Sequence, residues 1–213
     1  MLGVFVVAAT LVALAELGDK TQMLSLLLAT RYPARRVFLG VFLAVLALQF
    51  LATGAGRVVG DLVPAGVLAV LTSVLFVAFG IWSFVDSAKT DAEEAVPGRG
   101  SGFGPVVAVA TAFFLAELGD KTQVLTFAIA ADPGVATRAL SAIGVAAEET
   151  PSVGLFIAVW LGSALGMMLV NGAAILIGAA VGKRFSRKVV GRISGAVFVL
   201  FGIGAFVSYL IAR

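Results

Sequence analysis

Two identical acidic segments are the part of this sequence best equipped to do chemistry. The nine residues Leu-Ala-Glu-Leu-Gly-Asp-Lys-Thr-Gln occupy positions 14–22 and occur again, unchanged, at 115–123. Each copy lies in the middle of a long apolar segment, where an ionised carboxylate costs roughly 2.5–3.5 kcal/mol on membrane-insertion scales. Because such a cost usually signals a function, we expect the carboxylates of the two copies to form one cation site: Glu16, Asp19, Glu117 and Asp120.

The other polar groups near the two segments are neutral oxygen donors. Thr21 and Thr122 belong to the segments themselves, while Gln49 and Asn171 lie inside other apolar stretches, where an amide either ligates an ion or makes an interhelical hydrogen bond. The chain has no Cys and no His, which excludes thiolate and imidazole ligands. Hard oxygen donors suit Mn²⁺, Ca²⁺ or Mg²⁺. The predicted metal ligands are therefore Glu16, Asp19, Glu117, Asp120, Thr21, Thr122, Gln49 and Asn171.

Lys20 and Lys121 set the net charge of this predicted site. Each is four residues after a glutamate, so a purely structural ion pair within one helix is an alternative role. The structural alternative leaves both aspartates unexplained, and we favour charge compensation and carboxylate positioning over a direct part of the lysines in transport. Four carboxylates and two lysines sum to −2 (−4 + 2), which one divalent cation or two protons would neutralise. Competition between these two occupancies is the minimal physics of a cation/proton antiporter.

The composition predicts an all-α integral membrane protein. The sequence is 61% hydrophobic and 13% charged, with a mean hydropathy of +1.10. Its apolar runs exceed the roughly 20 residues that cross a bilayer core. We expect six transmembrane helices, near residues 3–29, 37–57, 64–85, 104–131, 153–181 and 189–211.

Lysines and arginines are distributed unevenly among the loops between these spans. The first, third and fifth loops hold ten, and the opposite side holds three, which are Arg57, Arg138 and Arg213. The positive-inside rule then places the loop at 86–102 in the cytoplasm and both termini outside. We expect a multi-pass protein of the inner (cytoplasmic) membrane.

The internal repeat extends beyond the acidic segments. An offset of 101 relates the two segments, and an offset of 122 relates Val-Phe-Leu-Gly at 37–40 to Val-Trp-Leu-Gly at 159–162 and Gln49 to Asn171. Each half therefore has three helices, and an odd number inverts the second half across the membrane. We expect two inverted three-helix repeats, at 1–86 and 103–213, joined by a cytosolic linker at 87–102. The outer loop at 132–152 has a candidate short surface helix around 136–147.

A glycine separates the glutamate and the aspartate in each segment, at Gly18 and Gly119. On a continuous helix, two residues three apart lie on nearly the same face. The glycine also allows the helix to open locally, which would free backbone carbonyls as further ligands.

The duplicated Glu-Leu-Gly-Asp-Lys-Thr resembles the Glu-x-Gly-Asp-(Lys/Arg)-(Thr/Ser) signature of a family of cation/proton antiporters. That family includes the Golgi transmembrane protein 165 and bacterial manganese exporters. The resemblance covers nearly the whole chain, and both copies match at every signature position. It implies that the four carboxylates form the cation site, with Thr21 and Thr122 nearby. It also implies export of Mn²⁺ or Ca²⁺ in exchange for H⁺, and the signature does not separate these two metals.

Other functions remain as alternatives at this point. Asp19 and Asp120 could form an intramembrane aspartyl protease dyad, although such enzymes place a glycine where this chain has Glu16 and Glu117. An exporter of small organic cations and a channel are the others. Our prediction is a transporter and not an enzyme, without a cofactor, whose transported ions are Mn²⁺ (or Ca²⁺) and H⁺. Its expected partners are the divalent cation and the lipid bilayer, with a homodimer left open and no nucleic acid.

Overall fold

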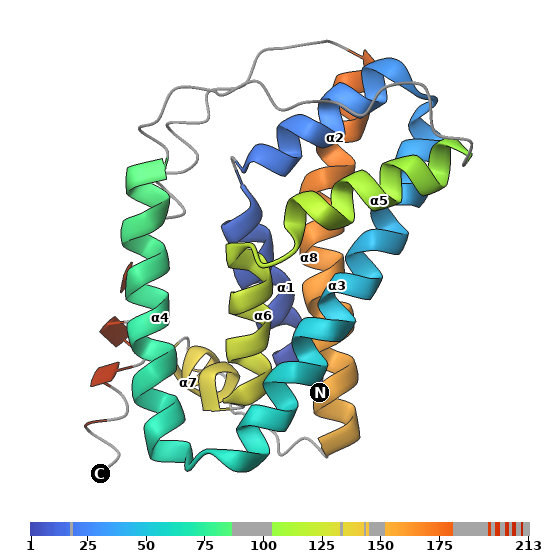
Figure 1. Cartoon of the computed structure of the whole chain (residues 1–213). Coiled ribbons are helices and arrows are strands. Elements are labelled where there is room, and N and C mark those ends of the chain that lie inside the picture. The colour runs from blue at the N-terminus through green and yellow to red at the C-terminus, as the bar shows by residue number, and fades with distance from the viewer. Residues whose placement is uncertain are drawn as a thin grey trace.

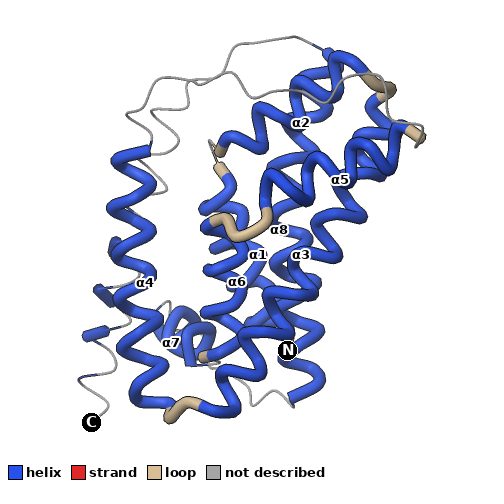
Figure 2. The backbone as a smooth tube through the Cα atoms, in the orientation of Figure 1, coloured by secondary structure: helices blue, strands red, loops and turns tan. Residues whose placement is uncertain are grey.

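A computed structural model describes residues 1–17, 19–86, 104–132, 134–142, 144 and 152–180, together with scattered positions between 196 and 210. Within these residues all regular structure is helical, as the sequence predicted (Figures 1 and 2). The helices are α1 (Leu2–Glu16), α2 (Lys20–Arg31), α3 (Ala34–Leu62), α4 (Ala65–Asp86), α5 (Pro105–Glu117), α6 (Lys121–Ala131), α7 (Gly134–Ala142) and α8 (Ser152–Ala180).

The two predicted spans that carry the acidic segments are each broken in two. α1 ends at Glu16 and α2 begins at Lys20, while α5 ends at Glu117 and α6 begins at Lys121. The break therefore falls at the same place in both copies. Gly119 has a φ of +81°, which a right-handed helix does not accommodate and which glycine adopts without strain. The sequence left open whether each helix continues through the glycine or opens there, and the structure shows that both open; Glu and Asp therefore do not share a helical face.

α3 and α8 are the two described helices that are long and apolar enough to cross a membrane, over Ala34–Leu62 and Ser152–Ile177. The 29 residues of α3 correspond to about 43 Å, more than the roughly 30 Å of a bilayer core. Shorter apolar helices occupy Leu2–Glu16, Gly66–Leu75 and Pro105–Glu117. α8 also leaves a row of apolar side chains bare at a spacing of four residues, which suits a face turned to lipid: Val153, Ile157, Leu161, Leu165 and Leu169.

Glycines set the close packing of the long helices on the broken ones. A methyl group added at Gly162 or Gly166 of α8 would overlap the backbone of α1. Methyl groups at Gly40, Gly56 or Gly60 of α3 would overlap the backbone of α5 or α6. Each long helix thus lies against a broken one, and α1 and α6 lie side by side in the middle of the molecule (Figure 1). This close approach holds the two breaks at the centre of the helical assembly.

α7 corresponds to the short helix expected in the outer loop; Thr137 and Ser141 on one face are exposed, and the other face is buried. Val135 and Ala136 are completely buried against the core, because the helix folds back under α1 and α4. Asp132 joins these elements, since it accepts hydrogen bonds from Thr72 of α4 (3.1 Å) and from the Gly134 amide (3.0 Å) and pairs with Arg138. The predicted linker at 87–102 lies outside the described residues, as does most of the predicted span at 189–211.

Candidate cation site

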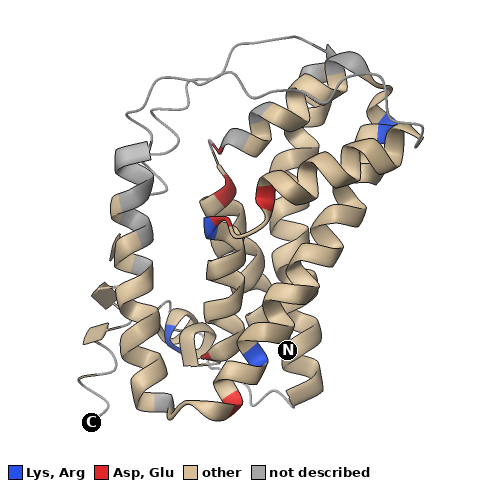
Figure 3. Cartoon of the chain, viewed as in Figure 1, with Lys and Arg blue, Asp and Glu red and all other residues tan. Residues whose placement is uncertain are grey.

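The breaks in the two helices bring the two acidic segments together. Figure 3 shows the acidic positions of both breaks near the centre of the molecule, among helices that are otherwise almost free of charge. Lys121 of the second segment reaches Asp19 of the first, with 2.5 Å between Nζ and the carboxylate. Glu16 and Glu117 are completely buried, and Asp19 is 7% exposed. Residues about a hundred positions apart in the sequence therefore share one buried polar centre.

Each glutamate is held by the threonine of its own segment. Thr21 donates a hydrogen bond to Oε1 of Glu16 (3.0 Å), and Thr122 donates one to Oε2 of Glu117 (3.3 Å). The second oxygen of each glutamate is buried and has no hydrogen-bond partner among the described residues. Each carboxylate thus has one fixed oxygen and one free oxygen, and the two segments share this arrangement.

Asn171 lies in the site, but its oxygen is already occupied. Its side-chain nitrogen donates to Oε1 of Glu16 (2.7 Å) and to the Met167 carbonyl (3.2 Å). Its oxygen accepts a hydrogen bond from Ser25 (2.8 Å). In this arrangement Asn171 is a donor to the glutamate, and its role as a metal ligand stays a prediction.

Gln49 makes a different contact from that of Asn171. Its nitrogen donates to the sulfur of Met167 (3.3 Å), and its oxygen is buried without a partner among the described residues. The structure records no hydrogen bond between Gln49 and a carboxylate in the described part of the chain. The two amides that the repeat makes equivalent therefore differ in what they bind.

The charges of the centre repel one another except where a lysine lies between them. Glu16 and Glu117 are close enough to repel, as are Asp19 and Asp120. Lys121 offsets Asp19, and this pair is largely shielded from solvent. No three acidic side chains of the described residues are close enough together to form a preassembled metal-binding group. The side chain of Lys20 lies outside the described residues.

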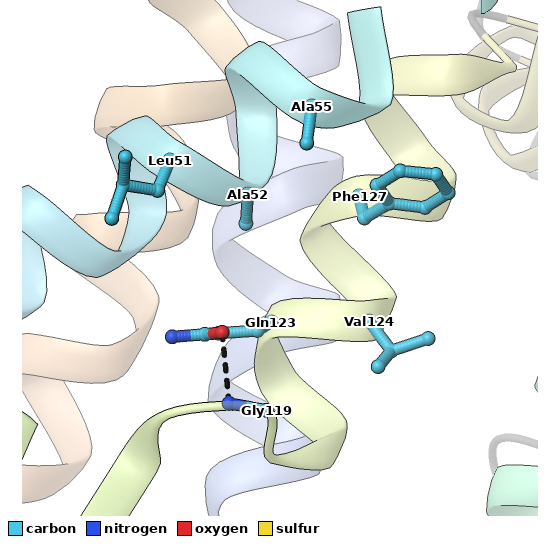
Figure 4. A pocket seen from close by; sticks show the side chains of 7 residues that line it. All are labelled: Leu51, Ala52, Ala55, Gly119, Gln123, Val124 and Phe127. Carbon is cyan, nitrogen blue, oxygen red and sulfur yellow. Dashed lines mark hydrogen bonds between the residues drawn. The ribbon is translucent and has the colours of Figure 1, made fainter. Parts of the chain in front are cut away.

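A cavity of about 460 Å³ lies beside the second break, which sequence reasoning did not predict (Figure 4). Gln123 forms its polar part: the side-chain oxygen accepts a hydrogen bond from the Gly119 amide (3.1 Å), and the nitrogen is buried without a partner in the described structure. The only sequence signal for this cavity is the small side chains of α3 at the contact. The lining residues are Leu51, Ala52, Ala55, Gly119, Gln123, Val124 and Phe127.

Apolar helices that enclose buried, paired carboxylates at helix breaks are typical of membrane proteins that transport ions. Comparison with known families agrees with this class. The chain belongs to the divalent cation/proton antiporter family GDT1, whose family model matches residues 4–91 and 139–211. The first acidic segment lies inside the matched residues, and the second lies between the two matched parts. The family is one of transporters, as the duplicated signature indicated.

Curated relatives match over nearly the full length of the chain. A "putative manganese exporter" of Vibrio cholerae is 35% identical over 95% of this chain and 90% of its own length. "GDT1-like protein sll0615" of Synechocystis is 30% identical over 95% of this chain and 96% of its own. "GDT1-like protein 5" of Oryza sativa subsp. japonica is 28% identical over 98% of this chain and 96% of its own. No solved structure matches this chain.

Proposed function

We propose that this protein exports Mn²⁺ from the cytoplasm in exchange for protons, with Ca²⁺ as the alternative substrate. The observation that carries the proposal is the matched pair of buried glutamates. Each has one oxygen fixed by a threonine and one oxygen free, and the lysine of one segment contacts the aspartate of the other. The name of the Vibrio cholerae relative supports manganese as the first metal to test.

In this proposal the free carboxylate oxygens bind the transported ion. They are Oε2 of Glu16, Oε1 of Glu117 and Oδ2 of Asp120, all buried. Asp19 completes the set when Lys121 leaves it. Because the carboxylates are not preassembled, the ion draws them together as it binds. Thr21 and Thr122 fix the glutamates, and the two lysines limit the negative charge of the empty site.

Proton exchange follows from the same charge balance. With all four carboxylates and both lysines ionised, the site carries −2 (−4 + 2). One divalent ion or two protons neutralise it, so each species displaces the other. An acidic exterior then loads protons and expels the metal, and the more alkaline cytoplasm loads metal. The direction of the proton gradient sets the direction of metal transport.

The membrane arrangement is part of the same proposal. We place six spans in two inverted repeats, at 1–86 and 103–213, with 87–102 in the cytoplasm and both termini outside the inner membrane. The first broken helix runs upward in Figure 1, from α1 into α2, and the second runs downward, from α5 into α6; these opposite courses support the inversion. The excess of Lys and Arg in the odd-numbered loops supports the orientation. A homodimer stays a prediction without support.

Flux measurements in proteoliposomes test the proposal. With the voltage clamped, Mn²⁺ or Ca²⁺ uptake is followed under an imposed pH gradient and again with the gradient reversed. We expect metal to move toward the acidic side and to change direction with the gradient. Metal flux that ignores the pH gradient would exclude antiport and favour a channel. Transport of organic cations without competition from Mn²⁺ would favour the organic-cation exporter.

A further inference from the structure

A three-residue hydrogen-bond chain orients Glu16, and we call it the first relay. Ser25 of α2 donates to the oxygen of Asn171, and Asn171 of α8 donates to Oε1 of Glu16. Because Ser25 fixes the amide oxygen, the amide nitrogen must point at the carboxylate. Each member is completely buried, so the chain is closed off from competing water. Glu16 therefore receives two donors on one oxygen, Thr21 and Asn171.

The internal repeat supplies a counterpart for every member of the first relay. The offset of 101 relates Ser25 to Thr126 and Glu16 to Glu117, and the offset of 122 relates Asn171 to Gln49. We call Thr126, Gln49 and Glu117 the second relay. All three are completely buried, as the members of the first relay are.

The second relay is not formed in this structure. The hydroxyl of Thr126, the side-chain oxygen of Gln49 and Oε1 of Glu117 all lack a hydrogen-bond partner among the described residues. The nitrogen of Gln49 donates instead to the sulfur of Met167, which is a weak acceptor. Buried polar groups are normally paired, and three unpaired atoms, one in each member of the second relay, require an explanation.

We propose that Asn171 and Gln49 are positioning residues that take turns in holding the two glutamates during transport. In the conformation described here, Ser25 and Asn171 hold Glu16. In the opposite conformation, Thr126 orients Gln49 onto Glu117, and Asn171 releases Glu16. The proposal rests on the inverted repeat and on the antiport proposed above. It assigns both amides to the glutamates and not to direct coordination of the metal.

The exchange of donors links conformation to ion binding. A glutamate that accepts two hydrogen bonds has part of its charge balanced by the protein. A glutamate that accepts only one hydrogen bond depends more on a proton or a metal ion for that balance. The released glutamate is therefore the one that exchanges a proton for the metal ion. The relay that is formed determines whether Glu16 or Glu117 is released.

Ser25→Ala and Thr126→Val test the proposal without altering either amide or either carboxylate. The measurement is the half-saturation concentration of Mn²⁺, determined separately in right-side-out and inside-out vesicles at equal pH on both sides. Loss of one net hydrogen bond changes the balance of two conformations by roughly three- to tenfold. We expect the two variants to shift the ratio of the two half-saturation concentrations by that factor in opposite directions. The double variant should return the ratio close to the wild-type value.

Ser163→Ala is the matched control, because Ser163 is a completely buried hydroxyl of α8 that is also unpaired and belongs to neither relay. It should leave the ratio unchanged.

Thermal unfolding establishes that each variant folds. Gln49→Met is a second variant of the second relay, and we expect it to shift the ratio in the same direction as Thr126→Val. Shifts in the same direction, or no shift in folded variants, overturn the relay. Absence of Mn²⁺ flux driven by the pH gradient in the wild type is a separate result, since it contradicts the antiport and not the relay alone.

Discussion

Glu16→Gln separates the charge of the proposed site from its shape. In the structure, Oε1 of Glu16 accepts hydrogen bonds from Thr21 and Asn171, and Oε2 has no partner among the described residues. The carbonyl oxygen of a glutamine can accept the same two bonds, so its amide nitrogen would lie where Oε2 is now. The variant therefore keeps the packing and the hydrogen bonds of the wild type and removes one negative charge.

The expected loss of affinity is large because the lost charge is fully buried. Removing one partner of a buried charge pair typically costs about 3–5 kcal/mol, which corresponds to roughly 10²- to 10⁴-fold weaker binding. The apo protein should unfold at the same temperature or a higher one, because the ionised carboxylate carried a desolvation penalty. Mn²⁺ titration by calorimetry and thermal unfolding in detergent measure the two quantities on the same sample.

Asp61→Asn provides the matched control for this variant. It removes the same charge from an exposed position, where Asp61 makes a loose pair with Arg57 (3.7 Å). Its Mn²⁺ affinity should equal that of the wild type, since an exposed ion pair contributes little and salt screens its charge. An unchanged Mn²⁺ affinity in Glu16→Gln would remove this carboxylate from the site and refute the reasoning.

Three further predictions concern the pH, a buried ion pair and a helix contact. Apparent Mn²⁺ affinity should fall as the pH drops from about 8 to 6, because protons compete for the same carboxylates; equal affinity at both pH values contradicts this. Asp132→Asn should destabilise the protein by roughly 2–4 kcal/mol, because it leaves the partly buried Arg138 without its ion-pair partner; an unfolding temperature equal to that of the wild type would argue against it. Gly166→Ala should lower the unfolding temperature, because its methyl group overlaps the α1 backbone, whereas Gly54→Ala has open space and should not lower it.

The sequence was sufficient to predict an all-helical fold and the acidic residues that lie together at its centre. Apolar runs predicted the helices, and the duplicated segment singled out the carboxylates that the structure brings into one centre. The exact path of the backbone could not be predicted from the sequence. Gly119 indicated that the helix could open, but its positive φ, which places Glu117 and Asp120 on different helices, depends on the packing around it.

The two interior amides show where sequence reasoning stops. Gln49 and Asn171 are chemically alike and occupy equivalent positions of the repeat, so composition and spacing assign them one role. The structure gives them different partners, a thioether for Gln49 and a carboxylate for Asn171. That difference depends on which neighbouring helix each amide meets. The burial of Val135 and Ala136 is a similar case, because only tertiary contacts decide which face of a short helix is covered.

The contact between Lys121 and Asp19 connects the two halves of the molecule through charge. Asp19 lies in the first break, directly before α2, and Lys121 is the first residue of α6. In the proposed mechanism an incoming divalent ion displaces the lysine from Asp19, and the lysine returns when the ion leaves. In the proposed mechanism the empty site is therefore never without a cation near Asp19. Ion binding at one segment then changes the electrostatic environment of the other, which is a physical reason for two halves to share one site.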